Sequence, residues 1–495
     1  MKAIPMKALR VLPALALAVA VAGPARADTT PDAAVALQTQ LHDWLASLLQ
    51  PAVIVAPDAV KVAPEGDHFR LGVPEPLALI GMGLADAGTL FSLSVRPMEA
   101  GRWALDDLHL PAPMRVTGPA LPAAPGGAPA APAPGVMELT LDGLQFHGVL
   151  DPSFTTTSSF DASFAGAHAT GPQATLTYGK STGNSILQPD GEGRITVTSK
   201  ADIGEMRQTA DMPDGSHYTL TIGRGHFETA VKKVSPADLA ALMRSISAFV
   251  PTAAGTGDSL SPAQRTLARN FVRTLRNLSE SASLSDTLDG LSVDLGGMGA
   301  SLRRLTMGGD IGAPDGIFSF GLQFGLEGLD SPMIPPGIYH DYLPRKIGLK
   351  SRVSGLKMDD LQTLALHAVD TDEKTMPALQ GEAMALLASG PLNVSLEAFS
   401  FDLGPASLEG NLSIDIASPT DITGDGDITV TGLDALIKRA NTTPELKQIA
   451  PVLIFLKGIG KQDGNETSFA ISYENGSLKV NDTDLSSMMP GNTKP

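Results

Sequence analysis

Alternating apolar and polar residues recur along most of this chain and predict a structure built mainly of β-strands. In residues 137–142, for example, apolar and polar side chains alternate strictly. A strand with this period of two has one apolar face and one polar face. Strands are expected at 53–62, 69–73, 91–95, 137–142, 154–164, 174–178, 194–200, 218–222, 226–232, 291–295, 301–309, 317–326, 346–353, 392–403, 407–416, 424–430, 467–473 and 478–480.

A second pattern, in which apolar residues recur every three or four positions, predicts amphipathic helices. The first covers residues 31–50, with Pro31 in its first turn and Pro51 after its end. Others are expected after Ser235 and Ser261 and at 357–369, 375–388, 433–440 and 444–456. The most apolar window, 449–459, is too short to span a bilayer and is interrupted by proline and lysine, so a buried helix is expected there.

The strand at 317–326 is one-sided in its apolar content. Phe318, Phe320, Leu322, Phe324 and Leu326 share one side by the period of two, and the glycines at 321 and 325 leave the other side thinly covered. Five large apolar residues on one face need a covering layer or a ligand. We therefore expect them to line an apolar groove, together with the inward residues of 392–403.

A short phrase, apolar-x-Gly-Leu, recurs at 141–144, 288–291, 326–329, 353–356 and 430–433. Its irregular spacing excludes a repeat of fixed period. It predicts that the same turn ends several strands of a long sheet.

The fold class predicted from these patterns is α+β, predominantly antiparallel β. A chain of 495 residues is too long for one core, so we expect two elongated curved-sheet domains, 28–255 and 256–495, each with a few covering amphipathic helices. Residues 111–135 are rich in proline, alanine and glycine and predict a flexible insert in the first domain.

The first 27 residues have the order of a secretory signal peptide. Lys2, Lys7 and Arg10 precede an apolar run from Val11 to Ala22, and Ala-Arg-Ala at 25–27 is a small-x-small cleavage site. The mature protein is therefore expected to begin at residue 28 and to lie in the periplasm, with no transmembrane span after cleavage.

Composition narrows the classes of function. The chain has no cysteine, which excludes disulfides, thiol catalysis and zinc–thiolate sites. Its formal net charge of −17 argues against nucleic acid, because nucleic-acid binding needs a basic surface. The same charge disfavours anionic membrane surfaces except at a local basic patch. We expect no cofactor and no resident metal.

Residues 179–183, Gly-Lys-Ser-Thr-Gly, match the G-x-S-x-G pattern of serine hydrolases, whose serine lies in a turn between a strand and a helix. A strand precedes this segment, but residues 184–191 do not have a helical pattern. A hairpin turn is therefore expected, and Ser181 is the candidate nucleophile only if the chain is a hydrolase.

Two further patterns bear on metal ions. Residues 421–427 resemble the first half of a calcium loop, but Gly432 stands where the bidentate glutamate is required, so an acidic turn is expected. His217 and His226 are predicted on neighbouring strands, near Glu228. Without a metal-binding spacing, surface histidines are expected.

The helix after Ser261 carries Arg265, Arg269, Arg273 and Arg276 within about 80° of one another around its axis. In so acidic a chain this stripe could meet an acidic partner or anionic headgroups. A solvated face that pairs with nearby carboxylates is the alternative.

The passages 424–437 (GDGDITVTGLDALI) and 471–481 (ISYENGSLKVN) resemble the AsmA-like group of bacterial envelope proteins and related periplasmic families. The resemblance covers mainly residues 288–481 and is one of strand pattern. It implies curved sheets with an apolar concave face and a role in envelope homeostasis or lipid movement, and it assigns no catalytic residue.

Three hypotheses for function follow. The first is an exported, non-enzymatic periplasmic protein that binds a lipid or another apolar ligand in a groove lined by residues 318–326. The second is a structural or protein-interaction component of the cell envelope that uses the arginine stripe. The third is a secreted serine hydrolase.

Overall fold

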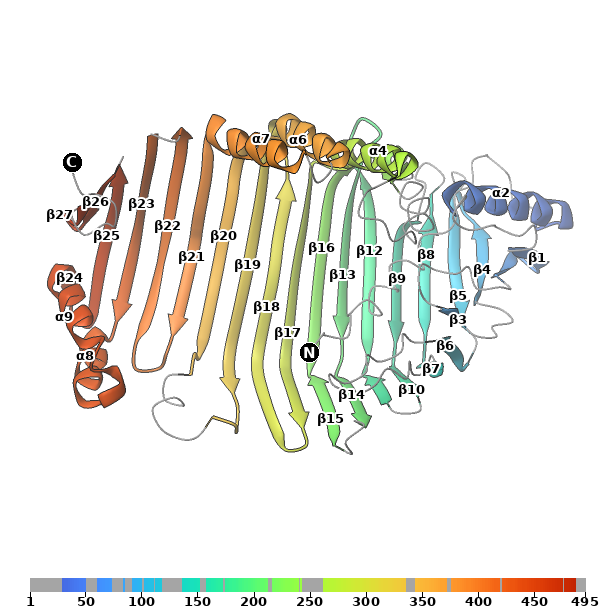
Figure 1. Ribbon diagram of the computed structural model, residues 1–495. Coiled ribbons are helices and arrows are strands. Elements are labelled where there is room, and N and C mark those ends of the chain that lie inside the picture. The colour runs from blue at the N-terminus through green and yellow to red at the C-terminus, as the bar shows by residue number, and fades with distance from the viewer. Residues whose placement is uncertain are drawn as a thin grey trace. The chain divides into compact units, whose positions relative to one another are not determined.

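The structure, a computed structural model, describes residues 29–49, 60–73, 83–84, 91–99, 102–110, 112–117, 136–151, 157–171, 174–211, 216–239, 241–242, 261–334, 343–371, 375–418, 421–474 and 476–486. The chain divides into two compact units, Met1–Ser279 (unit 1) and Glu280–Pro495 (unit 2). Both consist mostly of antiparallel strands with a few helices, which confirms the predicted fold class (Figure 1). The predicted signal peptide, 1–27, lies outside the described residues.

Unit 1 contains two series of antiparallel strands. Its elements are α2 (Pro31–Leu49), β1 (Lys61–Glu65), β2 (His68–Val73), β3 (Gly83–Leu84), β4 (Phe91–Pro97), β5 (Trp103–His109), β6 (Met114–Thr117), β7 (Val136–Asp142), β8 (Gln145–Leu150), β9 (Thr157–Phe164), β10 (Gly166–Thr170), β11 (Ala174–Tyr178), β12 (Ser181–Pro189), β13 (Ile195–Ile203), β14 (Met206–Asp211), β15 (His217–Ile222), β16 (Arg224–Val234) and α4 (Pro262–Leu278). One series pairs in the order β1, β2, β4, β5, β8, β9, β12, β13, β16. The other pairs in the order β3, β6, β7, β10, β11, β14, β15.

Long strands of unit 1 pass from one series to the other through a bend. β11 continues into β12 through Gly179 and Lys180, and its partner β13 continues into β14 through Gly204 and Glu205. The backbones approach closely here: Gly179 N donates to Glu205 O at 2.6 Å. A Cβ on Gly204 would lie 2.5 Å from the Lys180 carbonyl oxygen, so only glycine fits. Residues 179–180 therefore bend one long strand, and the predicted hairpin turn is wrong.

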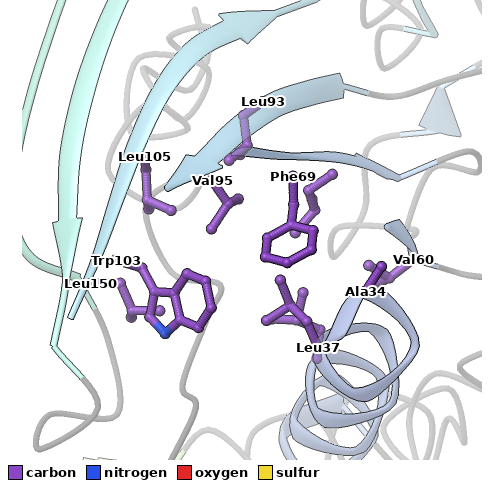
Figure 2. Close-up of a cluster of buried hydrophobic side chains, with 11 residues drawn as sticks. Ala34, Leu37, Val60, Phe69, Leu93, Val95, Trp103, Leu105 and Leu150 are labelled. Atoms are coloured by element: carbon purple, nitrogen blue, oxygen red, sulfur yellow. The ribbon is translucent and has the colours of Figure 1, made fainter. Parts of the chain in front are cut away.

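The core of unit 1 lies between α2 and the first strands (Figure 2). Helix α2 contributes Ala34, Leu37 and Leu41, all 3% exposed or less, from one face. Phe69 of β2 and Trp103 of β5 meet at a centroid distance of 6.2 Å in a tilted arrangement. Burying side chains of this size contributes roughly 1.5–3 kcal/mol each. The predicted helix and its apolar face are confirmed.

The predicted flexible insert, 111–135, begins with a strand. Met114–Thr117 forms β6, which pairs with β7 in the register Met114 to Leu139. Sheet pairing supplies the backbone hydrogen bonds that this proline-rich region was not expected to make. Residues 118–135 lie outside the described residues.

Unit 2 is an antiparallel meander, in which neighbours in sequence are neighbours in the sheet. Its elements are β17 (Ser281–Leu295), β18 (Met298–Gly312), η3 (Pro314–Gly316), β19 (Ile317–Asp330), β20 (Lys346–Lys357), α6 (Met358–Asp370), α7 (Met376–Ser389), β21 (Leu392–Asp402), β22 (Ser407–Ser418), β23 (Asp421–Thr431), α8 (Leu433–Thr442), η4 (Pro444–Leu446), α9 (Ala450–Ile459), β24 (Lys461–Asp463), β25 (Glu466–Glu474), β26 (Ser477–Val480) and β27 (Thr483–Asp484). The strands pair in the order β17 to β23, then β25, β26 and β27, with β24 beside β25. Helix α4 belongs to unit 1, whereas the predicted domain boundary assigned it to the second domain.

The five glycines of the repeated apolar-x-Gly-Leu phrase share a positive φ, between 62° and 112°; they are Gly143, Gly290, Gly328, Gly355 and Gly432. This backbone conformation is strained for residues with a Cβ, which explains why the phrase keeps glycine. Only Gly143 and Gly432 lie at strand ends as expected. The other three lie inside β17, β19 and β20, where they distort a strand that continues.

Candidate functional site

One side of the unit 2 sheet is apolar across many neighbouring strands. Strand register places Met307, Phe324, Leu349 and Phe399 in one row that crosses β18 to β21. Side chains two residues apart on a strand share a face, so the neighbouring rows that contain Leu322 and Leu326 lie on this same side of the sheet. We call this side, which carries Phe320, Leu322 and Phe324 with their cross-strand partners, the apolar face.

The apolar face is open to solvent between β17 and β22. Leu322 is 50% exposed and Phe324 is 41% exposed, values far above those of core residues. The exposed large side chains on this face are Leu284, Ile311, Phe320, Leu322, Phe324, Leu349, Val394 and Ile414. The helices expected to cover the sheets leave this part of the face uncovered within the described residues. Figure 1 shows α6 and α7 at the strand ends rather than across the strand centres.

The opposite side of the same strands is polar and closely bonded. Arg352 of β20 makes two hydrogen bonds to Asp310 of β18, at 2.7 and 3.1 Å, and further bonds to Ser319 at 3.0 Å and Glu397 at 2.6 Å. These carboxylates raise the pKa of the Arg352 guanidinium, with Asp310 as the largest cause. Lys350 and then Arg352 lower the pKa of Glu397. The cluster ties four consecutive strands together.

Gly321 explains how this cluster fits on the sheet. A Cβ at this position would lie 2.5 Å from Asp310 Oδ1 and 3.3 Å from Arg352 Nη2. The glycine side of β19 is therefore covered by an ion pair and is not thinly covered as expected. The pair occupies the space that a side chain would need.

At β25, the chain directly after α9 packs on the apolar face. A Cβ on Gly460, directly after α9, would lie 2.2 Å from Thr467 Cγ2 and 3.1 Å from a ring carbon of Phe469. Thr467 and Phe469 are 2% and 6% exposed, and both pair with apolar-face residues of β23. The apolar face is thus closed at Thr467 and Phe469 of β25 and exposes eight large side chains between β17 and β22, although Phe399 of β21 is buried.

The predicted groove residues share one side of β19, as the period of two requires. Phe320, Leu322 and Phe324 are exposed, whereas Phe318 and Leu326 are half-buried at the two ends of the row. Sequence reasoning missed the contributions of other strands, namely Leu284, Ile311, Leu349 and Ile414. Each of these strands alternates apolar and polar residues, so the signal was present, but the register that joins them could not be read from it.

The predicted arginine stripe lies on α4, which begins at the expected residue. Ser261 caps the helix with a complete capping box, in which its side chain accepts from Gln264 N. Arg265 and Arg269 are half-buried, and Arg273 and Arg276 are exposed. The four arginines therefore do not form a uniformly solvated face, and their role as an interaction stripe stays a prediction.

Ser181 lies at the start of β12 and is 5% exposed. Its hydroxyl donates to Gly179 O at 3.1 Å and accepts from Gly204 N at 3.4 Å. Among the described residues, no histidine or carboxylate hydrogen-bonds to it. Its bonds hold the bend between the two strand series, and the strand-turn-helix context of a nucleophilic serine is absent from this described segment.

The acidic segment 421–427 is not a loop or a turn. It forms the first part of β23, paired with β22 on one side and β25 on the other. Extended backbone cannot wrap its alternate carboxylates around one ion. The expected acidic turn is therefore wrong, and within the described residues no cluster of histidine and carboxylate side chains could hold a metal ion.

His217 and His226 are not brought together. His217 Nδ1 lies 2.7 Å from Asp211 Oδ1, whereas His226 lies 3.0 Å from Asp202 and 3.3 Å from Glu228. They belong to β15 and β16, which are successive parts of one bent strand. Asp202, and then Glu228, raise the pKa of His226. Both histidines lie at the surface, as expected.

A shallow hollow of about 740 Å³ lies in unit 1 beside α2, lined by Gln38, Lys61, Arg70, Ser92 and neighbouring residues. Its central cation, Arg70, donates to Glu65 at 3.1 Å and to Asp107 at 2.9 Å. The charge of Arg70 is therefore balanced within the unit, and the open apolar face of unit 2 remains the stronger candidate site.

In the parts of the chain that the structure describes, no helix is both long and apolar enough to cross a bilayer. Comparisons with protein-family models, curated proteins and solved structures found no match to this chain.

Proposed function

We propose that this is an exported, non-enzymatic protein of the periplasm that binds a lipid or another apolar ligand on the apolar face of unit 2, in a role in envelope homeostasis. The observation that carries the proposal is the set of eight exposed large side chains on this face, from Leu284 of β17 to Ile414 of β22. No other part of unit 2 covers them within the described residues. Water contact with so many apolar side chains is unfavourable, and a ligand would remove it.

The size of the apolar face suits an extended hydrocarbon chain. Six strands at about 4.8 Å apart give a length of roughly 24 Å. On β19 the exposed positions from Phe320 to Phe324 extend for roughly 13 Å, and each of the other five strands exposes one large side chain on this face. The apolar patch is thus at most about 300 Å², which is the size of the largest apolar patch on a typical monomer, often a functional surface. Burying it would contribute at most roughly 7 kcal/mol before the costs of ordering the ligand.

Two sequence features support the compartment and the ligand class. The signal-peptide pattern of residues 1–27 is typical of export. The resemblance of residues 288–481 to AsmA-like envelope proteins implies a role in lipid movement. The polar opposite side, held by Arg352 and Asp310, keeps the sheet stable and soluble while its other side stays free.

Native mass spectrometry and lipid extraction of the protein purified from its own envelope test this proposal. We expect a co-purified apolar molecule in the parent and its loss when Leu322 and Phe324 are both replaced by Ser. Gln323→Ser is the matched control, because Gln323 is exposed on the polar side of the same strand. Ligand-free protein, or equal ligand content in all three, would contradict the proposal.

A further inference from the structure

Helix α9 exposes several large apolar side chains to solvent. Val452, Ile454 and Phe455 are 57%, 52% and 42% exposed, and Ile449, directly before the helix, is 47% exposed. At 100° per residue, Ile449, Val452 and Phe455 lie within about 120° of one another around the axis, whereas Ile454 lies outside this arc. We call Ile449, Val452 and Phe455 the α9 ridge. A helix that is apolar on all sides belongs in a buried setting, yet in α9 only Ala450 is buried. The sequence-based expectation of a buried helix is therefore wrong for its exposed side chains.

The ridge is held in place by contacts of neighbouring residues. Gly460 packs on Thr467 and Phe469 of β25, and Asn481 Nδ2 donates to Ile459 O at 3.0 Å. Ala440 of α8 and Ala450 of α9 are 0% and 4% exposed. Figure 1 shows α8 and α9 beside β24, at the end of the strands of unit 2. These contacts fix the position of α9 on unit 2.

The sequence from α8 to the end of α9 is basic in a chain that is otherwise acidic. Residues 433–461 contain five basic side chains and two acidic ones, whereas the whole chain has a net charge of −17. Lys438 and Arg439 of α8 and Lys447 of the connection to α9 are exposed. Lys457, the charged residue of α9, pairs with Asp434 of α8 and links the two helices. The local charge has the sign that anionic headgroups attract.

We propose that the α9 ridge docks unit 2 on the surface of an anionic lipid bilayer. Val452 and Phe455 enter the boundary between headgroups and acyl chains, and Lys438 and Lys447 lie at the level of the headgroups. An apolar helix side combined with basic residues is typical of helices that lie in a membrane interface. Lysine side chains reach headgroup phosphates while their stems remain in apolar surroundings. The docking does not depend on a ligand of the apolar face, so either can fail alone.

The absence of native cysteine allows a direct test on the whole chain. A single cysteine, Val452→Cys, carries an environment-sensitive fluorophore, and Met384→Cys on α7, where Met384 is 66% exposed, is the matched control. With vesicles of equimolar phosphatidylglycerol and phosphatidylcholine, we expect a blue shift and quenching by acyl-chain quenchers at 452 and neither at 384. An unchanged emission at 452 would overturn the proposal.

Vesicle flotation gives the second measurement. The double variant Val452→Ser, Phe455→Ser should weaken binding to the same vesicles by about tenfold or more, because two apolar side chains that would enter the bilayer are lost. Lys438→Gln with Lys447→Gln should weaken binding to anionic vesicles and leave the weak binding to pure phosphatidylcholine unchanged. Unchanged flotation of the double serine variant contradicts docking through α9. Docking is also contradicted if light scattering shows that the parent is a dimer and the double serine variant a monomer, because the ridge would then join two copies.

Discussion

Phe324 in β19 and Leu349 in β20 lie opposite each other in the sheet, and their side chains remain 41% and 37% exposed. A cross-strand pair of this kind ordinarily stabilises a sheet by packing under a second layer. Phe399, next in the same row, is only 7% exposed. Side chains in this row are therefore exposed on β19 and β20 and buried on β21. The phenylalanines at 324 and 399 can thus be compared as an exposed and a buried ring of the same row.

Phe324→Ala and Phe399→Ala should have very different effects on the free energy of unfolding. The buried ring of Phe399 should cost about 3–5 kcal/mol when removed, because both transfer energy and a cavity are involved. The exposed ring of Phe324 should cost less than about 1 kcal/mol. Urea unfolding of the two variants measures the difference. Equal losses would show that Phe324 is covered in solution.

The bend in unit 1 gives a prediction about glycine. Gly204→Ala should destabilise the protein by about 1–3 kcal/mol, because the new Cβ would meet the Lys180 carbonyl oxygen and force the two strands apart. Gly72→Ala in β2 is the control, since a Cβ there meets nothing within 4 Å. Thermal unfolding should rank the two variants clearly, and similar midpoints would mean that the bend relaxes without strain.

Arg352 should matter more than other surface arginines. Arg352→Gln leaves Asp310 and Glu397 without their shared donor, and we expect a loss of about 1–3 kcal/mol. Arg303→Gln is the control: its bond to Glu327 is 3.3 Å long and its side chain is 72% exposed, so a change under about 0.5 kcal/mol is expected. Adding Asp310→Asn to Arg352→Gln should recover part of the loss in urea unfolding, because Glu397 keeps its pair with Lys350 whereas Asp310 has lost its guanidinium partner.

His226 should make stability depend on pH. Its pKa is raised in the folded state, first by Asp202 and then by Glu228, so folding favours its protonated form. This contribution is complete below the unfolded value of about 6.5 and is lost as pH rises through the raised folded value. His226→Gln should therefore cost more stability at pH ~5.5 than at pH ~9.

Asp202→Asn provides the control for this pH effect. In that background the cost of His226→Gln should vary less with pH, because the largest cause of the raised pKa is gone. Unfolding curves at the two pH values measure it. A cost that is constant with pH in the parent would mean that His226 titrates alike in both states.

How far the sequence could predict this structure differs between local and distant features. The alternation in residues 318–326 was sufficient to place their side chains on one side of β19, because the period of two is a local property. It could not show that Leu349 and Ile414 extend the apolar face, since register depends on strand pairing. Nor could it show that the face stays uncovered, since coverage depends on where helices pack.

Local preference also failed where sheet neighbours override it. Aspartate and glycine are rare in strands, so residues 421–427 were expected to form a turn. In the structure they lie between β22 and β25, whose backbone groups provide full ladders on both sides. The same reason explains the strand at Met114–Thr117. Its proline-rich neighbours predicted an irregular segment, but β7 supplies a partner for its backbone hydrogen bonds.

The row arrangement has a consequence for the motion of any bound hydrocarbon. One row is apolar in every strand from β17 to β22: Ala282, Ile311, Phe320, Val353, Val394 and Ile414. A hydrocarbon lying along this row would meet another apolar side chain after each step of about 4.8 Å. Displacement by one strand exchanges one set of contacts for a nearly equal one. If the proposed ligand binds there, the row would hold it by its total length and oppose its sliding only weakly, so the sheet would act as a track as well as a binding surface.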